Sequence, residues 1–413
     1  MRKFSLSVII CSLLLVTCSK SDRQSPVNLS HALRLVDSIA VNEERINYIA
    51  IYADYPDYKP VAAKGEGIAC VDDVGRFLEV LENEILVSGN RTLLPTAIGL
   101  TKFLLYMCRA DGLWYNFLET DGRINTTHIN SQADFGWWAT RGIRGLTAAH
   151  LILKKFPGEA ELLGQVDKYL RTTLKQMDAD LSKYAQTIAG EFGPVPGWLI
   201  KSAPDMNSEL LLALCKLQRS GDFELSPAIQ KIAEGLVGFQ FRREGHPLDG
   251  LYFCWQNSWH DWGANQPLAL VEAFKITGDS TFCQSVQIWA DNFVPFLIKH
   301  NLPREIILNG DGSYRLTELP QIAYGVSALY SGIQAFADLS GEIRYQRYAA
   351  RIFKWFDGDN PAQIRMYWPE TGVTFDGIDE DKTVNRNSGA ESTIEGLLAH
   401  QRNFYRKQSD KET

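Results

Sequence analysis

Apolar residues recur along the chain at positions i, i+3, i+4 and i+7, a spacing typical of amphipathic helices. The helical segments come in six pairs. Their first members are expected at residues 31–52, 91–108, 160–182, 226–241, 280–298 and 342–356. Their second members are expected at residues 72–87, 133–155, 205–219, 261–277, 320–338 and 389–405. Because the alternation of a half-buried β-strand is scarce, the pattern predicts an all-α protein.

The connections between these segments alternate between short and long. A glycine-containing turn closely follows each of the first five second members, as at Ser88-Gly89-Asn90 and Thr277-Gly278-Asp279. In contrast, loops of about 15 to 30 residues precede the second members, and ordered loops of that length are usually functional. If the pairs close into a ring, all the long loops emerge at one end, beside the N-termini of the second members.

The two sets of segments also differ in composition. Second members are rich in small and apolar residues, as in Gly145-Leu146-Thr147-Ala148-Ala149, whereas first members carry more charge, as in Arg344-Tyr345-Gln346-Arg347. An inner ring buried on all sides and an outer ring with one wet face have this composition. The pattern resembles the six-hairpin glycosidase superfamily, whose fold is the (α/α)6 toroid. The resemblance implies a single toroid domain over residues 29–406.

The N-terminus has the pattern of an export signal. Arg2 and Lys3 precede an apolar stretch at residues 4–16 that is too short to span a bilayer. The sequence Leu15-Val16-Thr17-Cys18 resembles a lipobox, which implies a signal peptide at 1–17 and lipidation of Cys18. Residues 18–28 then form a polar tether, and residues 407–413 a disordered tail. We therefore expect an exported protein, lipid-anchored to a bacterial membrane; an ordinary signal peptide is the alternative.

Charge and motif content exclude several classes of protein. The formal net charge is −7, and it becomes −9 without the two basic residues of the signal peptide. Such a chain, without a basic tract, is not expected to bind nucleic acid or a membrane surface electrostatically. No phosphate-binding glycine loop, GxSxG or HExxH motif occurs, and five further cysteines have no metal-binding spacing. We expect no cofactor and no metal.

Acidic residues open five of the six second members. Each one alone is explained as a helix cap that complements the helix dipole. However, seven of the ten tryptophans lie in the long loops or first turns of the same end, namely Trp137, Trp138, Trp198, Trp255, Trp259, Trp262 and Trp368. Aromatic rings beside carboxylates suit a sugar, whose C–H faces stack on rings while its hydroxyl groups bond to acids.

These features predict a carbohydrate site at the long-loop end. Glycosidic cleavage needs a carboxylic acid and a carboxylate. The catalytic candidates are Asp73, Asp134, Asp261 and Glu391. Repulsion within Asp72-Asp73 is expected to raise one of the two pKa values. The candidates for substrate binding are Asp72, Arg76, Trp137, Trp138, Trp259, His260, Trp262, Asn265, Trp368 and Arg386. We therefore expect a glycoside hydrolase acting on an extracellular oligo- or polysaccharide.

Besides a glycoside hydrolase, a polysaccharide lyase and a glycan-binding protein remain open at this stage. Unsaturated glucuronyl and rhamnogalacturonyl hydrolases use acids at the starts of neighbouring inner helices, which Asp73 and Asp134 match by location, but the surrounding motifs are not evident. A polysaccharide lyase needs a base and a cation, for which the candidates are His128, His260, Tyr324, Arg141, Arg315 and Arg386. A non-catalytic glycan-binding lipoprotein is the third possibility. A terpenoid cyclase is disfavoured, because a lone Asp-Asp lacks the longer acidic motif.

Overall fold

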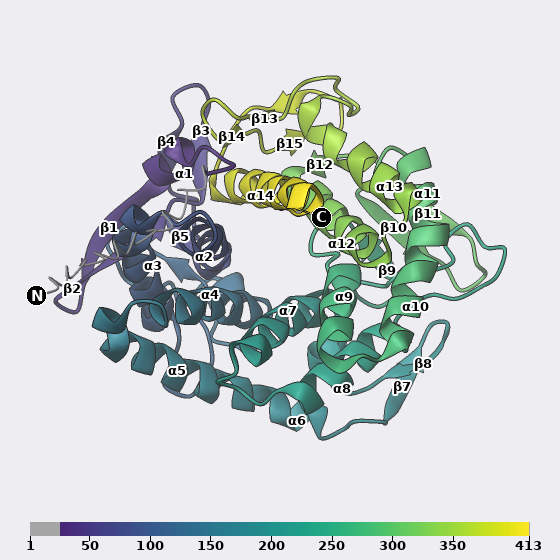
Figure 1. Ribbon diagram of the computed structural model, residues 1–413, viewed down its shortest axis with the longest axis horizontal. Helices are drawn as coiled ribbons and strands as arrows, with labels where there is room; N and C mark the ends of the chain where they lie inside the picture. Colours follow the sequence, from purple (N-terminus) through teal and green to yellow (C-terminus); the bar gives the residue numbers. More distant parts are fainter. Residues whose placement is uncertain (1–24, 413) are drawn as a thin grey trace, which may run out of the picture.

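The computed structural model describes residues 25–412, and six helices of this part of the chain form a closed inner ring (Figure 1). They are α2 (Val71–Leu86), α4 (Trp137–Leu153), α7 (Pro204–Ser220), α9 (Gln266–Thr277), α12 (Ala323–Ser340) and α14 (Ala390–Glu412). Each helix contacts the next, and α14 contacts α2, so the ring closes between the first and last of them. The expected (α/α)6 toroid is confirmed.

Outer helices lie against the inner ring. They are α3 (Leu94–Met107), α5 (Ala160–Leu174), α8 (Ser226–Gly238), α10 (Ser280–Ile288) with η6 (Trp289–Phe293) and α11 (Val294–Lys299), and α13 (Ile343–Phe353). Short helical segments are α1 (Ser30–Leu35), α6 (Asp178–Leu181), η1 (Arg91–Leu93), η2 (Ile129–Ser131), η3 (Pro157–Glu159), η4 (Lys175–Met177), η5 (Ile200–Ser202) and η7 (Lys354–Asp357).

The expected outer helix at residues 31–52 is wrong. Only α1 is helical there, and the antiparallel pair β1 (Val36–Val41) and β2 (Glu44–Ile49) follows it and packs against α3. Five apolar residues of the two strands are β-branched, which favours a strand: Val36, Ile39, Val41, Ile46 and Ile49. The turn at residues 42–43 has positive φ angles of 47° and 69°, as two-residue hairpin turns require. The spacing of three residues between Val36 and Ile39, and between Ile46 and Ile49, predicts a helix where the chain forms a hairpin.

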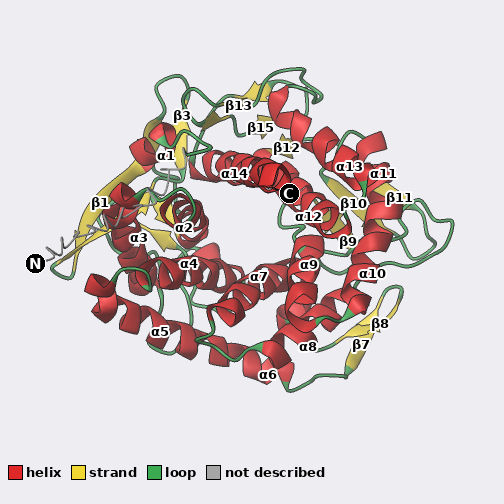
Figure 2. Ribbon diagram, viewed as in Figure 1, coloured by secondary structure: helices red, strands yellow, loops and turns green. Residues whose placement is uncertain are grey.

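The long connections are held by small antiparallel sheets at the N-terminal end of the inner helices (Figure 2). Two-stranded pairs are β3 (Tyr52–Asp54) with β4 (Lys59–Val61), β5 (Ala69–Cys70) with β6 (Phe117–Leu118), β7 (Thr187–Gly190) with β8 (Gly193–Pro196), and β13 (Tyr367–Trp368) with β14 (Val373–Thr374). Three-stranded sheets join β9 (Ser258–His260), β10 (Glu305–Leu308) and β11 (Tyr314–Thr317), and β12 (Gln321–Ile322), β15 (Gly377–Ile378) and β16 (Val384–Asn385).

The predicted signal peptide and Cys18 lie outside the described residues, as does the tether up to residue 24. Helix α14 is assigned through Glu412, and so includes residues 407–412 of the predicted tail. Among the described residues, no helix has both the length and the apolar character needed to cross a membrane. The five cysteines of this part are free thiols.

Two glycines bring α2 and α4 into close contact. A Cβ atom on Gly75 would lie 2.4 Å from the carbonyl oxygen of Arg141. One on Gly145 would lie 2.6 Å from the Cα atom of Gly75. The backbones therefore approach more closely than any side chain allows, and this sets the height of Arg141 relative to the first turn of α2.

Gly75→Ala is therefore expected to lower the free energy of unfolding by about 1–3 kcal/mol, because the two helices must separate. Gly164→Ala, in the outer helix α5, is the matched control: its Cβ meets nothing within 4 Å, and alanine should stabilise the helix by about 0.5–1 kcal/mol. Urea denaturation measures both. Equal stability changes in the two variants would contradict the close packing.

Candidate active site

The guanidinium group of Arg76 lies among four carboxyl groups at the start of α2 and α14. Its Nε atom is 3.2 Å from Oδ1 of Asp72, and its Nη2 atom is 2.7 Å from Oδ1 of Asp73. Nη2 is also 3.2 Å from Oε2 of Glu391, and Nη1 is 3.0 Å from Oε1 of Glu395. Helical spacings of three and four residues put these groups on one face. One buried positive charge thus faces four acids, which favours protonation of some of them.

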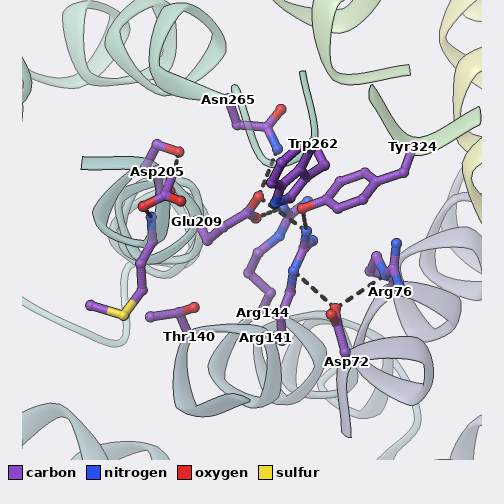
Figure 3. Close-up of polar contacts among 12 residues, drawn as sticks. Asp72, Arg76, Thr140, Arg141, Arg144, Asp205, Glu209, Trp262, Asn265 and Tyr324 are labelled. Carbon is purple, nitrogen blue, oxygen red and sulfur yellow. Dashed lines mark hydrogen bonds and ion pairs between the residues drawn. The ribbon is translucent and has the colours of Figure 1, made fainter. Parts of the chain in front are cut away.

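Further ion pairs continue across the ring (Figure 3). Nε of Arg141 is 3.0 Å from Oδ1 of Asp72, and its Nη2 is 3.1 Å from Oε1 of Glu209. Arg141 also donates to the hydroxyl of Tyr324, and Asn265 donates to Glu209 over 2.7 Å. We call this set the ionic layer. Its members are Asp72, Asp73, Arg76, Glu79, Arg141, Arg144, Glu209, Asn265, Tyr324, Glu391 and Glu395.

A cavity of about 450 Å³ lies behind the ionic layer, towards the C-terminal ends of the inner helices. Arg141, Asn265 and Glu395 belong to the ionic layer and also line this cavity. The layer therefore separates the cavity from the long-loop end of the ring, which we call the mouth.

Two carboxyl groups of the ionic layer have pKa values displaced in opposite directions. Burial raises the pKa of Asp72, but Arg76 and Arg141 outweigh it and hold this pKa below its ordinary value. Burial, reinforced by the charge of Asp72, raises the pKa of Glu391 despite the nearby Arg76. Burial also raises the pKa of Asp73 to about 7. The surroundings of Asp72 therefore favour its ionised form, and those of Glu391 favour its protonated form.

Exposure separates the acids that face the mouth from those behind them. The side chain of Glu391 is 44% exposed and that of Asp72 16%, whereas that of Asp73 is only 3% exposed. Asp73 accepts a hydrogen bond from the thiol of Cys70 over 3.2 Å. Tyr52 of β3 is only partly exposed. Its partial burial raises the pKa of its hydroxyl to about 12, and the charges of Asp73 and Glu391 add to the shift. A ligand at the mouth therefore meets Glu391 before it meets Asp73.

His260 lies at the mouth with an acceptor at each ring nitrogen. Nδ1 is 2.6 Å from the carbonyl oxygen of Trp262, and Nε2 is 3.4 Å from Oδ2 of Asp205. Burial lowers the pKa of His260, but Cys254 and Asp205 outweigh burial and raise it to about 11. The ring stacks on Trp262 at 3.8 Å between centroids. His260 is therefore held as a charged imidazolium against an indole.

Asp261 is buried and its carboxyl group packs over Gly325 at the start of α12. A Cβ atom on Gly325 would lie 2.0 Å from Oδ2 of Asp261. Oδ1 of Asp261 is buried and makes no hydrogen bond with the described residues. Burial raises the pKa of this carboxyl to about 8, although His260 opposes the shift. Asp261 is therefore protonated at neutral pH.

The pKa of Asp261 makes stability depend on pH. The folded state keeps a proton that the unfolded chain releases near pH 4, so this contribution is lost as pH rises towards 8. Asp261→Asn, which is neutral at every pH, is expected to be more stable than the wild type at pH 8.5 and to match it more closely at pH 5. Thermal unfolding at both pH values measures this difference. A constant offset between the two proteins would contradict the raised pKa.

Other predicted residues lie apart from the ionic layer. Asp134 pairs with Lys201 on the rim, where both side chains are about half exposed. Trp138 is partly buried against the hydrophobic core. Trp259 is 1% exposed and packs edge-to-face on Phe293, so it belongs to the core and not to a surface that a substrate reaches.

Trp368 and Arg386 also make their contacts elsewhere. Trp368, in β13, lies under the guanidinium of Arg365, and Arg386 lies over the ring of Tyr55. In contrast, Trp137 donates from its indole nitrogen to Oδ2 of Asp72 over 3.3 Å. Six of the predicted residues thus belong to the ionic layer or contact it: Asp72, Asp73, Arg76, Trp137, Asn265 and Glu391. His260, Asp261 and Trp262 lie just before Asn265 in the sequence, at the same end of the ring.

The sequence analysis did not propose several members of the ionic layer as site residues. Glu79, Arg144, Glu209 and Glu395 lie one to two turns inside the inner helices, not at their starts. Their signal in the sequence is charge within otherwise apolar helices. Glu79, Arg144 and Glu395 follow Arg76, Arg141 and Glu391 by three or four residues, and Glu209 follows Asp205 by four. Within residues 25–412, no group of three or more potential ligands among His, Cys, Asp and Glu is arranged to hold a metal ion.

No protein-family model and no curated protein sequence matches this chain. Solved structures do match its fold. Cellobiose 2-epimerase from Bacillus thermoamylovorans B4167 superimposes with a TM-score of 0.65 at 14% identity, covering 92% of this chain and 97% of the epimerase. A D-mannose isomerase gives 0.62 at 10% identity, covering 92% and 95%. An unsaturated glucuronyl hydrolase specific for heparin gives 0.53 at 12%, covering 87% and 92%. These similarities establish the class, an (α/α)6 toroid.

Proposed function

We propose that this protein is a glycoside hydrolase that acts on an oligo- or polysaccharide. One observation carries the proposal: Glu391 and Asp72 have oppositely displaced pKa values and are held by a single guanidinium group. Glycosidic cleavage needs one carboxyl group that donates a proton to the leaving oxygen and one carboxylate that acts as base or nucleophile. Glu391 has the first property and Asp72 the second.

The position of the two groups supports these roles. Glu391 has the more exposed carboxyl group, and its raised pKa favours the protonated form where a glycosidic oxygen can approach. Asp72 is less exposed but ionised, and its charge stabilises the positive charge that develops on the sugar ring. The carboxyl groups of Glu391 and Asp72 both contact the guanidinium group of Arg76. They are therefore close enough to act on the same glycosidic linkage. Asp73, whose pKa is raised to about 7, lies behind them.

Aromatic groups at the mouth suit a sugar ring. The indole of Trp137 reaches Asp72, Trp262 stacks on His260, and Tyr52 is exposed near Glu391. Rings placed beside acids bind the C–H face of a sugar while the acids bind its hydroxyl groups. The names of the matching structures, which include a glucuronyl hydrolase and a cellobiose epimerase, agree with a carbohydrate substrate. Lipidation at Cys18 would give access to extracellular glycans.

A sugar epimerase or isomerase is the second candidate. His260 favours it, because a charged imidazolium paired with Asp205 at the mouth can stabilise the negative charge that develops on a carbonyl oxygen. The epimerase and isomerase structures also have higher TM-scores than the glucuronyl hydrolase. This chemistry moves a proton on carbon and leaves every glycosidic linkage intact.

One set of assays separates the candidates. Purified protein is incubated with oligosaccharides and polysaccharides in deuterated water. We expect new reducing ends without deuterium on carbon and without the absorbance of a conjugated double bond. Deuterium at C2 with a constant number of reducing ends would establish the epimerase instead. An unsaturated product would establish a lyase, and binding without any product would establish a glycan-binding protein.

A further inference from the structure

A second concave surface lies outside the mouth. It has a volume of about 950 Å³ and lies between the β7–β8 hairpin, residues 238–243 and residues 253–257. Figure 2 shows this hairpin at the outer margin of the ring, next to α8 and α10. We call this surface the outer groove. Its size is that of a site for a ligand larger than one sugar.

Aromatic rings form the wall of the outer groove. Phe192, at the tip of the β7–β8 hairpin, stacks parallel on Phe253 at 5.5 Å and meets the edge of Phe241 at the same distance. Trp255 is 52% exposed, more than any other tryptophan of residues 25–412. Exposed rings in a polar surround, here with Gln256 and Asn257, suit the alternating apolar faces and hydroxyl groups of a saccharide.

The backbone holds Trp255 outwards. Trp255 and Ser258 exchange backbone hydrogen bonds across a two-residue turn, and the hydroxyl of Ser258 also donates to the carbonyl of Trp255. Within that turn Gln256 has a φ of 49°, a left-handed conformation that non-glycine residues rarely adopt. A two-residue hairpin turn requires a positive φ at such a position, so the turn itself accounts for this conformation and holds Trp255 at its edge.

The inner end of the outer groove reaches the rim of the mouth. Lys201 lines the groove, and its ammonium group pairs with Asp134. Asp134 lies three residues before Trp137, whose indole donates to Asp72 in the ionic layer. Two side-chain contacts, joined by the short segment from Asp134 to Trp137, thus connect the groove with the ionic layer.

We propose that the outer groove binds a glycan chain that extends from the mouth, which makes the substrate an oligo- or polysaccharide and not a disaccharide. This substrate class rests on the proposed function, whereas saccharide binding in the groove does not. The occupant is a run of linked sugars that lies against Trp255 and Phe192.

Affinity electrophoresis tests the proposal with five soluble polysaccharides: hydroxyethyl cellulose, xylan, glucomannan, polygalacturonate and heparin. The protein carries Glu391→Gln, so that the chains stay intact. We expect at least one polymer to retard it, and Trp255→Ala to weaken that affinity about tenfold. Trp255→Phe, which keeps a ring, should recover most of it. Ile343→Ala, which removes an exposed apolar side chain from the start of α13 in the outer ring, is the control and should change nothing.

The outcomes separate this inference from the proposed function. No retardation by any of the five polymers, or equal affinity in Trp255→Ala, would overturn the outer groove as a glycan site. Normal hydrolysis of a short substrate alongside that result would leave the proposed function standing. Conversely, Trp255-dependent binding by a wild-type protein that releases no product would keep the groove and reject the hydrolase.

Discussion

Glu391→Gln is expected to lower the rate of hydrolysis about 10²–10⁴-fold while the protein stays folded, because glutamine has the same shape but no proton to donate. The loss should depend on the leaving group. An aryl glycoside with an acidic leaving group needs little protonation, so the variant should lose far less activity on it than on an unactivated sugar. Steady-state rates on both substrates measure this difference.

The dependence of the hydrolysis rate on pH tests the roles of Glu391 and Asp72 independently. Glu391 acts in its protonated form, so activity should fall as pH rises through its raised pKa. Asp72 acts ionised with a lowered pKa, so activity should persist well into acid. The alkaline fall should be absent from the residual activity of Glu391→Gln. Glu318→Gln, an exposed acid before α12, is the control and should keep both rate and profile. Full activity in Glu391→Gln would reject the assignment.

Arg76→Met is expected to cause the largest loss of stability, about 3–5 kcal/mol at pH 8, because four acids lose their shared counter-charge in a buried site. Methionine fills most of the volume, so the loss reflects charge more than a cavity. Without Arg76 the carboxyl pKa values rise, the folded state binds more protons, and part of the stability should return on acidification to pH 5. Urea denaturation at the two pH values measures both effects.

Arg123→Met is the matched control for this variant. Arg123 pairs with Asp121 at 2.7 Å, but both side chains are mostly exposed, so water screens the pair and little change is expected at either pH. If Arg76→Met unfolds like the wild type at pH 8, the four carboxyl groups are not compensated by Arg76 and the ionic layer has been misjudged.

The inner ring was predictable because its helices are long and apolar on nearly every face, and because glycine turns mark their ends. The first outer helix was not, because Val36 and Ile39, like Ile46 and Ile49, are three residues apart as on one face of a helix, although they lie in strands. Hydrophobic periodicity decides long segments and leaves short ones ambiguous. Only the hairpin register, with Val36 opposite Ile49, resolves this one.

The site was predictable only where helix starts meet. Sequence analysis proposed Asp73 and Glu391 together, and both bind Arg76. It named Asp73 as a catalytic candidate and Asp72 as a binding candidate, but the side chain of Asp72 is the more exposed of the two, because exposure depends on the rotation of α2. Asp134 has the same local pattern, yet it turns to Lys201 on the rim. Helix rotation and partner choice are properties of the assembled ring and leave no mark in a single sequence.

The seam between α2 and α14 has a consequence for how the protein is made. Arg76 reaches Glu391 and Glu395 across 315 and 319 residues of chain. A nascent chain on the ribosome therefore carries Arg76 with Asp72 and Asp73 long before Glu391 and Glu395 are synthesised. The acid-rich cluster is therefore completed only when α14 joins the ring, and a product truncated before Ala390 lacks the two acids that this helix supplies.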